Sequence, residues 1–376
     1  MCYDPPRVRI LIDYRPALRQ RTGVGEYVAG LATALAARLP REDSLTLFSS
    51  SWKDRLPVAA VPGTSQIDAR IPVRLLNFAW HRLEWPPVEW LAGHVDVVHA
   101  LHPLLIPARR AAKLVTIHDL YFLDHPEHTT AEIRRDYSAL TADHTRRADG
   151  IVVNSRYTGR LVAERFGIDP ERVAVCYPGN PGWPRRPDPT LPGPILFLGT
   201  AEPRKNLRRL VEAYAAVLDG QDHTPDLVIA GAAQGSPQAL LAGAPLPARV
   251  LDRTRLTGYV SDKERARLYR EASMLVLPSL DEGFGITALE AMTIGVPVVA
   301  SNSGALPEVV GDAGILVDPE DVAALAAAIA RVLGDGSLRR RMADDGVARA
   351  GQFTWASSAA NLDEAYRAAH RRRSAR

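Results

Sequence analysis

The chain is poor in cysteine and in long apolar runs. Of its 376 residues only two are cysteine, at positions 2 and 176, which excludes a disulfide framework and a cysteine-rich zinc site. No apolar run approaches the ~18 residues of a transmembrane helix, and the charged residues within 1–9 argue against a signal peptide. We therefore expect a cytoplasmic protein without a membrane-spanning helix.

A strong charge of either sign is also lacking. The formal net charge is only +3, and no basic stripe interleaved with aromatic residues occurs, so we expect no nucleic-acid partner. Three arginines at 371–373 are the exception, and we expect a solvated, disordered tail there. With 46% hydrophobic and 24% charged residues the chain is globular, and its length suits two domains.

Strand-like runs alternate with helical ones, which predicts parallel sheets built from βα units. A proline-rich stretch at 178–194 interrupts the alternation and is a linker. The expected strands before and after it are 8–12, 45–48, 95–99, 114–117, 151–153, 173–176, 195–198, 227–230, 274–277, 296–299 and 315–317.

Two glutamates lie eight residues apart around a glycine-rich bend that follows the apolar run 274–277. Gly283 and Gly285 let the chain turn tightly and approach a ligand. Glu282 then lies at the carboxyl end of a strand and Glu290 inside the next helix, whose first amides suit a diphosphate. By itself such a pair is more often a solvated loop acid and a helix-surface acid.

The residues around this pair resemble retaining family 4 glycosyltransferases. The matching motifs are Pro278-Ser279, Glu282-Gly283-Phe284-Gly285, Leu289-Glu290-Ala291-Met292, Gly295-Val296-Pro297-Val298-Val299 and Pro307-Glu308-Val309. The resemblance implies that Glu282 contacts the donor sugar and Glu290 holds the nucleotide ribose. It also places three backbone amides near the sugar and phosphates, those of Gly283, Phe284 and Gly285.

The resemblance also implies an α/β fold of the GT-B type, with two Rossmann-like doubly wound domains facing a central cleft. The linker then separates an acceptor-side domain, residues 1–185, from a nucleotide-sugar-binding domain, residues 186–352. A last helix, at about 353–370, returns to the first domain, as is common in this fold.

A second candidate site, residues 199–207, follows the first strand of the second domain. Lys205 is one of only four lysines and can place a compact charge on a phosphate, while Arg204 offers a planar fork. Many relatives have arginine directly after the glycine that corresponds to Gly199, where this chain has Thr200. We therefore expect Arg204 to supply the second cationic contact instead. The alternative is that both are surface cations at a helix start.

Near the N-terminus, Thr22, Gly23 and Gly25 follow a long loop after the first strand. We expect these glycines to lie before the helix rather than to open it directly, so the spacing is not that of a dinucleotide-binding fingerprint. The resemblance implies that this loop approaches the donor phosphate or the acceptor. The alternative is a tight turn without a binding role.

His118 follows the strand expected at 114–117 and thus lies at the ligand-binding edge of the first sheet. Alone it could equally be a structural histidine, but the family places a catalytic-site histidine on the sugar at a comparable strand end. Together with Asp119, Asp124, His125 and His128 it could suggest a metal, although the spacing matches no tetrahedral signature. No Asp-x-Asp pair occurs, and that pair is the usual metal-bridging motif of the other glycosyltransferase fold. We therefore expect neither a metal site nor a cofactor.

The expected reaction is transfer of a hexose from a nucleotide diphosphate to an acceptor hydroxyl. Residues 22–27, 118–120 and 199–206 most resemble mannosyltransferases of O-antigen and related polysaccharide assembly, which suggests GDP-mannose, with UDP- or dTDP-hexoses as the alternative. Relatives line the nucleobase slot with the segment that contains Tyr259, which either stacks on the base or is half buried.

The expected acceptor is a carbohydrate or a lipid-linked carbohydrate. We expect the aromatic segment 78–90 to be a core helix followed by a proline turn; the alternative is that it forms part of the acceptor side or contacts the inner face of a membrane. A GT-B epimerase or hydrolase, and a non-catalytic ligand sensor, are the rival functions.

Overall fold

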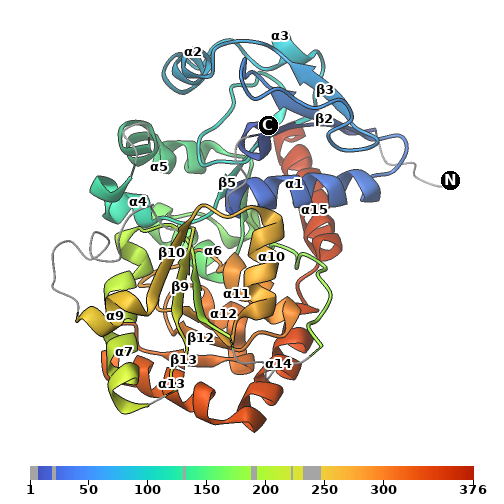
Figure 1. Ribbon diagram of the computed structural model, residues 1–376. Helices are drawn as coiled ribbons and strands as arrows, with labels where there is room; N and C mark the ends of the chain where they lie inside the picture. Colours follow the sequence, from blue (N-terminus) through green and yellow to red (C-terminus); the bar gives the residue numbers. More distant parts are fainter. Residues whose placement is uncertain (1–6, 19–22, 130–132, 188–192, 222, 232–246) are drawn as a thin grey trace. The chain divides into compact units, whose positions relative to one another are not determined.

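The computed structural model divides into two compact units (Figure 1). The N-terminal unit comprises Met1–Gly179 and Thr354–Arg376, and the C-terminal unit comprises Asn180–Phe353, whereas the sequence suggested a boundary after residue 185. The structure describes residues 7–18, 23–129, 133–187, 193–221, 223–231 and 247–376.

The N-terminal unit is built on a seven-stranded parallel sheet in the order β3-β2-β1-β4-β5-β6-β7. The strand order reverses between β1 and β4, so the crevice at their carboxyl ends is the switch point where doubly wound sheets bind ligands. The strands are β1 Arg9–Asp13, β2 Ser44–Ser49, β3 Ser65–Asp68, β4 Val97–Ala100, β5 Ala112–Ile117, β6 Gly150–Val153 and β7 Val173–Val175.

Side chains alternate between the two faces of this sheet. Ile10 and Ile12 of β1 enter one core and Leu11 enters the other. The helices are α1 Gly23–Arg38, α2 Val73–Phe78, α3 Glu89–Ala92, α4 Tyr121–Asp124, α5 Ser138–Arg147, α6 Arg156–Phe166 and α15 Trp355–Ser374, with short 3-10 or π turns η1 Arg15–Leu18, η2 Ala79–Leu83, η3 Pro126–His128, η4 Ile133–Tyr137 and η5 Pro170–Arg172.

The last helix, α15, packs beside α1 in the N-terminal unit (Figure 1). Its Leu362 and Tyr366 are buried in the same core as the α1 residues. The expectation of a disordered tail at 371–373 is wrong, because α15 continues to Ser374. Arg372 donates to the carbonyl oxygens of Asp149 and Glu171 and thereby ties the helix end to the unit.

The C-terminal unit has a six-stranded parallel sheet in the order β10-β9-β8-β11-β12-β13, with its switch point between β8 and β11. The prediction of two doubly wound domains is confirmed. The elements are β8 Ile195–Leu198, η6 Pro203–Lys205, α7 Leu207–Gly220, β9 Leu227–Ala230, α9 Ala248–Asp252, β10 Thr254–Gly258, α10 Asp262–Glu271, β11 Met274–Leu277, α11 Ile286–Ile294, β12 Val298–Ser301, α12 Leu306–Val310, η7 Gly311–Ala313, β13 Ile315–Val317, α13 Val322–Gly334 and α14 Gly336–Ala350.

In the part of the chain that the structure describes, no helix combines the length and the apolar character needed to cross a bilayer.

Candidate functional site

Glu282 forms the centre of a charged cluster at the switch point of the C-terminal unit. It lies in the loop after β11, while Lys205 and Arg204 follow the neighbouring strand β8. The Lys205 Nζ is 2.5 Å from Oε1 of Glu282, and the Arg204 Nη1 is 3.3 Å from Oε2. The Ser279 hydroxyl donates to Oε1 at 2.8 Å. The structure therefore brings together three of the predicted site residues.

Burial and charge oppose each other at Glu282, which is only 5% exposed. Burial by itself would raise the pKa of this carboxyl, but the charges of Lys205 and Arg204 outweigh it and lower the pKa. Glu282 is consequently an anion at neutral pH, and it holds both cations in place before any ligand arrives.

Arg204 has a second carboxylate partner that the sequence did not reveal. Its Nε donates to Oε2 of Glu202 at 2.8 Å, and the Thr200 hydroxyl donates to Oε1 of the same carboxylate at 2.6 Å. Thr200, the residue that departs from the family pattern, thus positions Glu202 instead of supplying a cation. The charge of Arg204 is divided between two acids, whereas Lys205 has Glu282 as its ion-pair partner.

The backbone around Glu282 depends on a close approach by the loop after β12. Gly304 adopts φ of +64°, and a Cβ there would lie 2.5 Å from the amide nitrogen of Glu282. The Ala305 amide then donates to the Glu282 carbonyl at 2.9 Å. Glycine at 304 therefore fixes the loop that carries the acid.

Glu290 lies inside α11, as the sequence predicted. It is only 4% exposed. Tyr269 donates its hydroxyl to Oε2 at 2.9 Å, and Nη1 of Arg265 is 3.3 Å from Oε1. The Arg265 guanidinium lies over the ring of Trp183, 5.5 Å from its centroid. These partners on α10 and in the linker were not foreseen, and they hold the carboxylate in one orientation.

The glycine-rich bend has the tight geometry that the sequence predicted. Gly285 has φ of +99° and immediately precedes α11, and a Cβ at this position would lie 2.6 Å from the Leu306 side chain. Phe284 is buried and packs edge-on against Phe353, with ring centroids 5.7 Å apart. Gly283, which lies between Glu282 and Phe284 in the sequence, is also buried. The bend thus presents the N-terminus of α11 near the acid.

Tyr259 follows the edge strand β10 and is 55% exposed. About half of its surface is thus open to solvent within its own unit, which fits both predicted roles. A role in base stacking stays a prediction.

In the N-terminal unit, His118 directly follows β5 and is partly buried. Its Nε2 donates to the Leu101 carbonyl at 3.2 Å, so Nδ1 is the acceptor nitrogen. Tyr27 of α1 packs edge-on against the imidazole, with centroids 5.3 Å apart. Burial, the largest cause, lowers the pKa of His118. The ring is thus a neutral, oriented group.

The glycines near the N-terminus lie closer to the helix than expected. Gly23 is the first residue of α1 and Gly25 lies in its first turn, so the expectation that both precede the helix is wrong. A Cβ on Gly25 would lie 3.0 Å from the Pro16 carbonyl oxygen, so this position allows η1 and α1 to approach each other. Thr22 lies outside the described residues.

One cluster at the N-terminal switch point was missed. Asp13, at the end of β1, is fully buried and is 2.5 Å from Arg15 and 3.3 Å from His102. Burial by itself would raise the pKa of Asp13, but Arg15 and His102 lower it strongly. Arg15 also donates to the Asn77 side chain at 2.9 Å. An acid that ends the apolar strand Arg9–Asp13 was the available signal.

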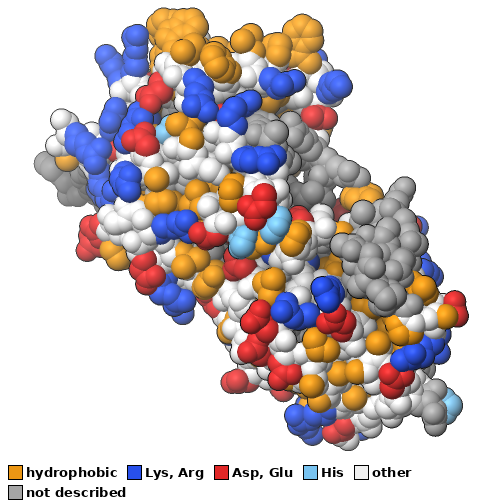
Figure 2. Space-filling model, turned by 90° about the vertical axis from the view of Figure 1, so that its left-hand side faces the viewer, with side chains coloured by type: hydrophobic (Ala, Val, Ile, Leu, Met, Phe, Trp, Pro, Cys, Tyr) orange, Lys and Arg blue, Asp and Glu red, His pale blue; other side chains and the backbone are white. Residues whose placement is uncertain are grey.

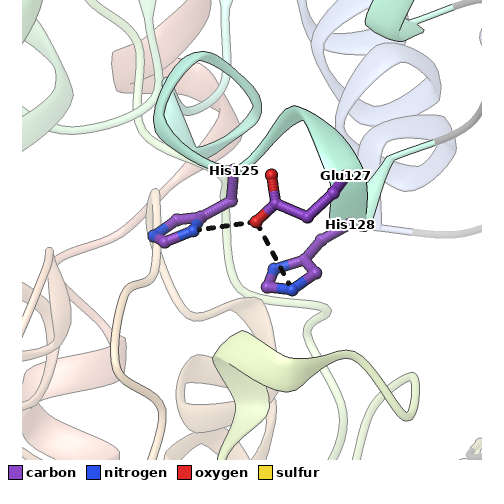
Figure 3. A group of neighbouring side chains, drawn as sticks. All are labelled: His125, Glu127 and His128. Carbon is purple, nitrogen blue, oxygen red and sulfur yellow. Dashed lines mark hydrogen bonds and ion pairs between the residues drawn. The ribbon is translucent and has the colours of Figure 1, made fainter.

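The cluster suggested for a metal separates in the structure. Asp124 pairs with Arg165 at 2.8 Å, and His118 bonds Leu101. His125 and His128 instead lie on either side of Glu127 (Figure 3), a residue that the sequence analysis did not include.

Comparison with known proteins identifies the family. A family profile described as Glycosyltransferase Family 4 matches residues 21–180, and one described as Glycosyl transferases group 1 matches residues 189–349. The O-antigen chain mannosyltransferase B of Escherichia coli is 30% identical, over 96% of this chain and 100% of that protein. A D-inositol 3-phosphate glycosyltransferase of Corynebacterium glutamicum is 32% identical, over 94% of this chain and 93% of that protein.

Solved structures share the fold along nearly the whole chain. Sucrose-phosphate synthase from Thermosynechococcus elongatus gives a TM-score of 0.73 at 22% identity, covering 96% of this chain and 98% of that one. Anabaena HepE in complex with UDP and glucose gives 0.65 at 18% identity, covering 96% and 99%. With two matching profiles and a relative 30% identical over nearly its full length, this chain belongs to the family 4 glycosyltransferases of GT-B fold.

Proposed function

We propose that this protein transfers mannose from GDP-mannose to a hydroxyl of a carbohydrate or lipid-linked acceptor, with retention at the anomeric carbon and without a metal ion. The observation that carries the proposal is the ion pair of Lys205 with the buried Glu282 at the switch point of the C-terminal sheet. A cation and a hydroxyl-binding carboxylate there suit a diphosphate and the sugar attached to it.

In the proposed reaction the bond from the anomeric carbon to the diphosphate breaks, and a bond from the same carbon to the acceptor oxygen forms. The acceptor proton passes to the departing diphosphate oxygen on the same face of the sugar. Negative charge develops mainly on the diphosphate, where Lys205, Arg204 and the N-terminus of α11 would stabilise it. Glu282 would bind sugar hydroxyls, Glu290 the ribose, and His118 the sugar.

Metal independence follows from that electrostatic arrangement. A lysine, an arginine and the first amides of α11 supply the positive potential that Mg²⁺ or Mn²⁺ provides in metal-dependent transferases.

The choice of mannose and guanine rests on similarity to the Escherichia coli mannosyltransferase. Glu290 would hold any ribose and Lys205 any diphosphate, so neither distinguishes the base. UDP- and dTDP-hexoses are therefore the alternative donors, and HepE, solved with UDP and glucose, supports keeping them in the test.

Product analysis tests the proposal against its rivals. Incubation of the protein with GDP-mannose and a membrane or polysaccharide extract should yield a glycosylated product that keeps the α configuration. Rapid release of free sugar from the donor alone would instead identify a hydrolase, and conversion of the donor to another sugar nucleotide would identify an epimerase. Absence of any turnover, with nucleotide binding intact, would favour a ligand sensor.

A peripheral contact with a membrane is part of the same proposal. Seven of the nine large hydrophobic side chains that are exposed among the described residues lie between Trp52 and Trp90. In Figure 2 hydrophobic side chains gather with Lys and Arg at the upper end of the view, where Figure 1 draws α2 and α3. The seven are Trp52, Val58, Leu75, Phe78, Leu83, Trp85 and Trp90.

Trp85 and Trp90 pack edge-on with centroids 5.7 Å apart, and the Arg109 guanidinium lies 5.3 Å from the Trp90 centroid. Exposed tryptophans beside arginine suit the interface of an anionic bilayer. Such a contact would hold the protein at the cytoplasmic face, close to a lipid-linked acceptor. Sedimentation with anionic vesicles should be lost in Trp85→Ser/Trp90→Ser, and wild-type protein that stays in solution would contradict the contact.

A further inference from the structure

Three side chains in the segment after His118 converge on one point of the surface. His125 lies between α4 and the turn η3, Glu127 and His128 lie within η3, and both imidazoles face the Glu127 carboxylate (Figure 3). The Nδ1 of His125 is 3.3 Å from Oε1 of Glu127, and the Nε2 of His128 is 3.6 Å from the same oxygen. Among the described residues this is the one such group whose ligand atoms all lie within 4.8 Å of one another.

Both imidazoles are held in position by a neighbouring ring. The Tyr121 ring lies over His125 with centroids 4.5 Å apart, and His125 in turn stacks on His128 at 5.3 Å with nearly parallel planes. Nδ1 of His128 is 3.0 Å from the Tyr121 hydroxyl, which leaves Nε2 as the nitrogen that faces Glu127. A hydrogen bond to the far nitrogen is the usual support for a histidine that binds a metal.

The ligand types define the ion. Two imidazole nitrogens and one carboxylate oxygen suit a borderline divalent ion such as Zn²⁺, whereas Ca²⁺ and Mg²⁺ prefer oxygen alone. Metal–ligand bonds of about 2.0–2.1 Å in a tetrahedral site put ligand atoms about 3.3 Å apart. The two distances to the Glu127 oxygen, 3.3 and 3.6 Å, are close to that spacing.

We propose that His125, Glu127 and His128 bind one divalent transition-metal ion, with Zn²⁺ as the best match and water in the fourth position. The ion links the two ends of a four-residue segment and so restrains the chain that leads away from the carboxyl end of β5. None of its three ligands has a role in the proposed transfer reaction, so the ion extends the proposed function without altering it.

Titration of tag-free, metal-stripped full-length protein tests the site. Isothermal titration with ZnCl₂ should show one equivalent bound, and CoCl₂ should produce the visible absorption of tetrahedral Co²⁺. His128→Ala and Glu127→Gln should each weaken Zn²⁺ binding at least tenfold. His94→Ala is the matched control, because His94 is exposed beside Asp96 with Nε2 3.5 Å from its carboxylate, yet belongs to no three-ligand group among the residues that the structure describes.

Protection against heat provides an independent readout. Zn²⁺ should raise the melting temperature of wild-type protein and of His94→Ala, and leave that of His128→Ala unchanged. Absence of stoichiometric Zn²⁺ binding, or binding that His128→Ala and His125→Ala both leave unchanged, would overturn the site. Loss of transfer on stripping the ion, restored by Zn²⁺, would overturn its separation from the reaction.

Discussion

The two sheets present different chemistry at their carboxyl ends. The C-terminal edge carries permanent charges in pairs, Glu282 with Lys205 and Glu290 with Arg265. The N-terminal edge has one such pair, Asp13 with Arg15, but its unit also contains nine of the ten histidines, all except His223. Burial, the largest cause for each, lowers the pKa of His81 and His99 to about 3 and of His144 to about 4.

This difference indicates a division of work. At the C-terminal edge the carboxylates already hold the positive groups in position. To bind an anionic diphosphate, these cations need only exchange a carboxylate partner for the ligand. Neutral, buried imidazoles suit an uncharged hydroxyl-rich ligand but make their unit sensitive to acid. The predictions below separate the two edges.

The largest effect should follow removal of Glu282. Glu282→Ala removes the centre of the charged cluster, and transfer should fall by roughly two to three orders of magnitude, the scale of one preorganised transition-state contact. Steady-state kinetics on protein checked for folding by circular dichroism measures it. The isosteric Glu282→Gln controls for lost volume, and near-wild-type turnover in both variants would show that Glu282 is not a catalytic residue.

Glu290→Ala should act on binding rather than on turnover. Loss of the ribose contact should weaken nucleotide diphosphate binding about tenfold, or roughly 1.4 kcal/mol. Glu320→Ala is the matched control, since Glu320 is an exposed acid of the same unit paired with Arg209. Unchanged affinity in Glu290→Ala would remove this residue from the donor site.

Acid should weaken the N-terminal unit first. The pKa of His99 is 6.5 in the unfolded chain, and burial lowers it to about 3 in the folded protein. The unfolded state therefore takes up the proton first as the pH falls. The contribution of His99 to stability is complete above about pH 6.5 and is lost as the pH falls toward 3.

Hydrogen exchange between pH 6.5 and 4.5 measures this in each unit separately. Exchange should accelerate in β4 and β5 before it does in β8 and β11, and His99→Gln should reduce the pH dependence whereas His94→Gln should not. Equal acceleration in both units would contradict the contrast between them.

The smallest effect should come from chelation. With charges supplied by Lys205 and Arg204, EDTA should leave the transfer rate unchanged. Complete loss of transfer, restored by Mg²⁺ or Mn²⁺, would show that the cations of the C-terminal edge are insufficient.

The strands that could be predicted from sequence are those with an apolar run, and most of them are buried on both faces. The runs expected at 195–198, 227–230 and 274–277 coincide with β8, β9 and β11. β3 was missed because it is an edge strand, partly exposed and rich in polar residues, so it lacks an apolar run.

The strand expected at 296–299 begins two residues later, as β12, because Pro297 has no amide hydrogen for the ladder.

Individual site residues could be predicted, but their partners could not. Glu282 and Lys205 each lie in a recognisable local pattern, yet the contact between them joins positions 77 residues apart. In the sequence Gly304 resembles any turn glycine. Only the structure shows that a Cβ at this position would collide with the Glu282 backbone. Asp13 could have been noticed as an acid that ends an apolar strand, but only the fold brings His102 to it. Glu127 is a single acid whose position facing two histidines is likewise visible only in the structure.

Isothermal titration of GDP, UDP and dTDP into wild-type protein and Glu290→Ala tests the central claim most directly. We predict that wild-type protein binds GDP most tightly and that Glu290→Ala loses about tenfold in affinity. Tighter binding of UDP or dTDP than GDP by about tenfold, roughly 1.4 kcal/mol, would replace mannose as the donor sugar and leave the transferase assignment intact. Binding of none of the three would contradict a nucleotide-sugar site at the C-terminal edge.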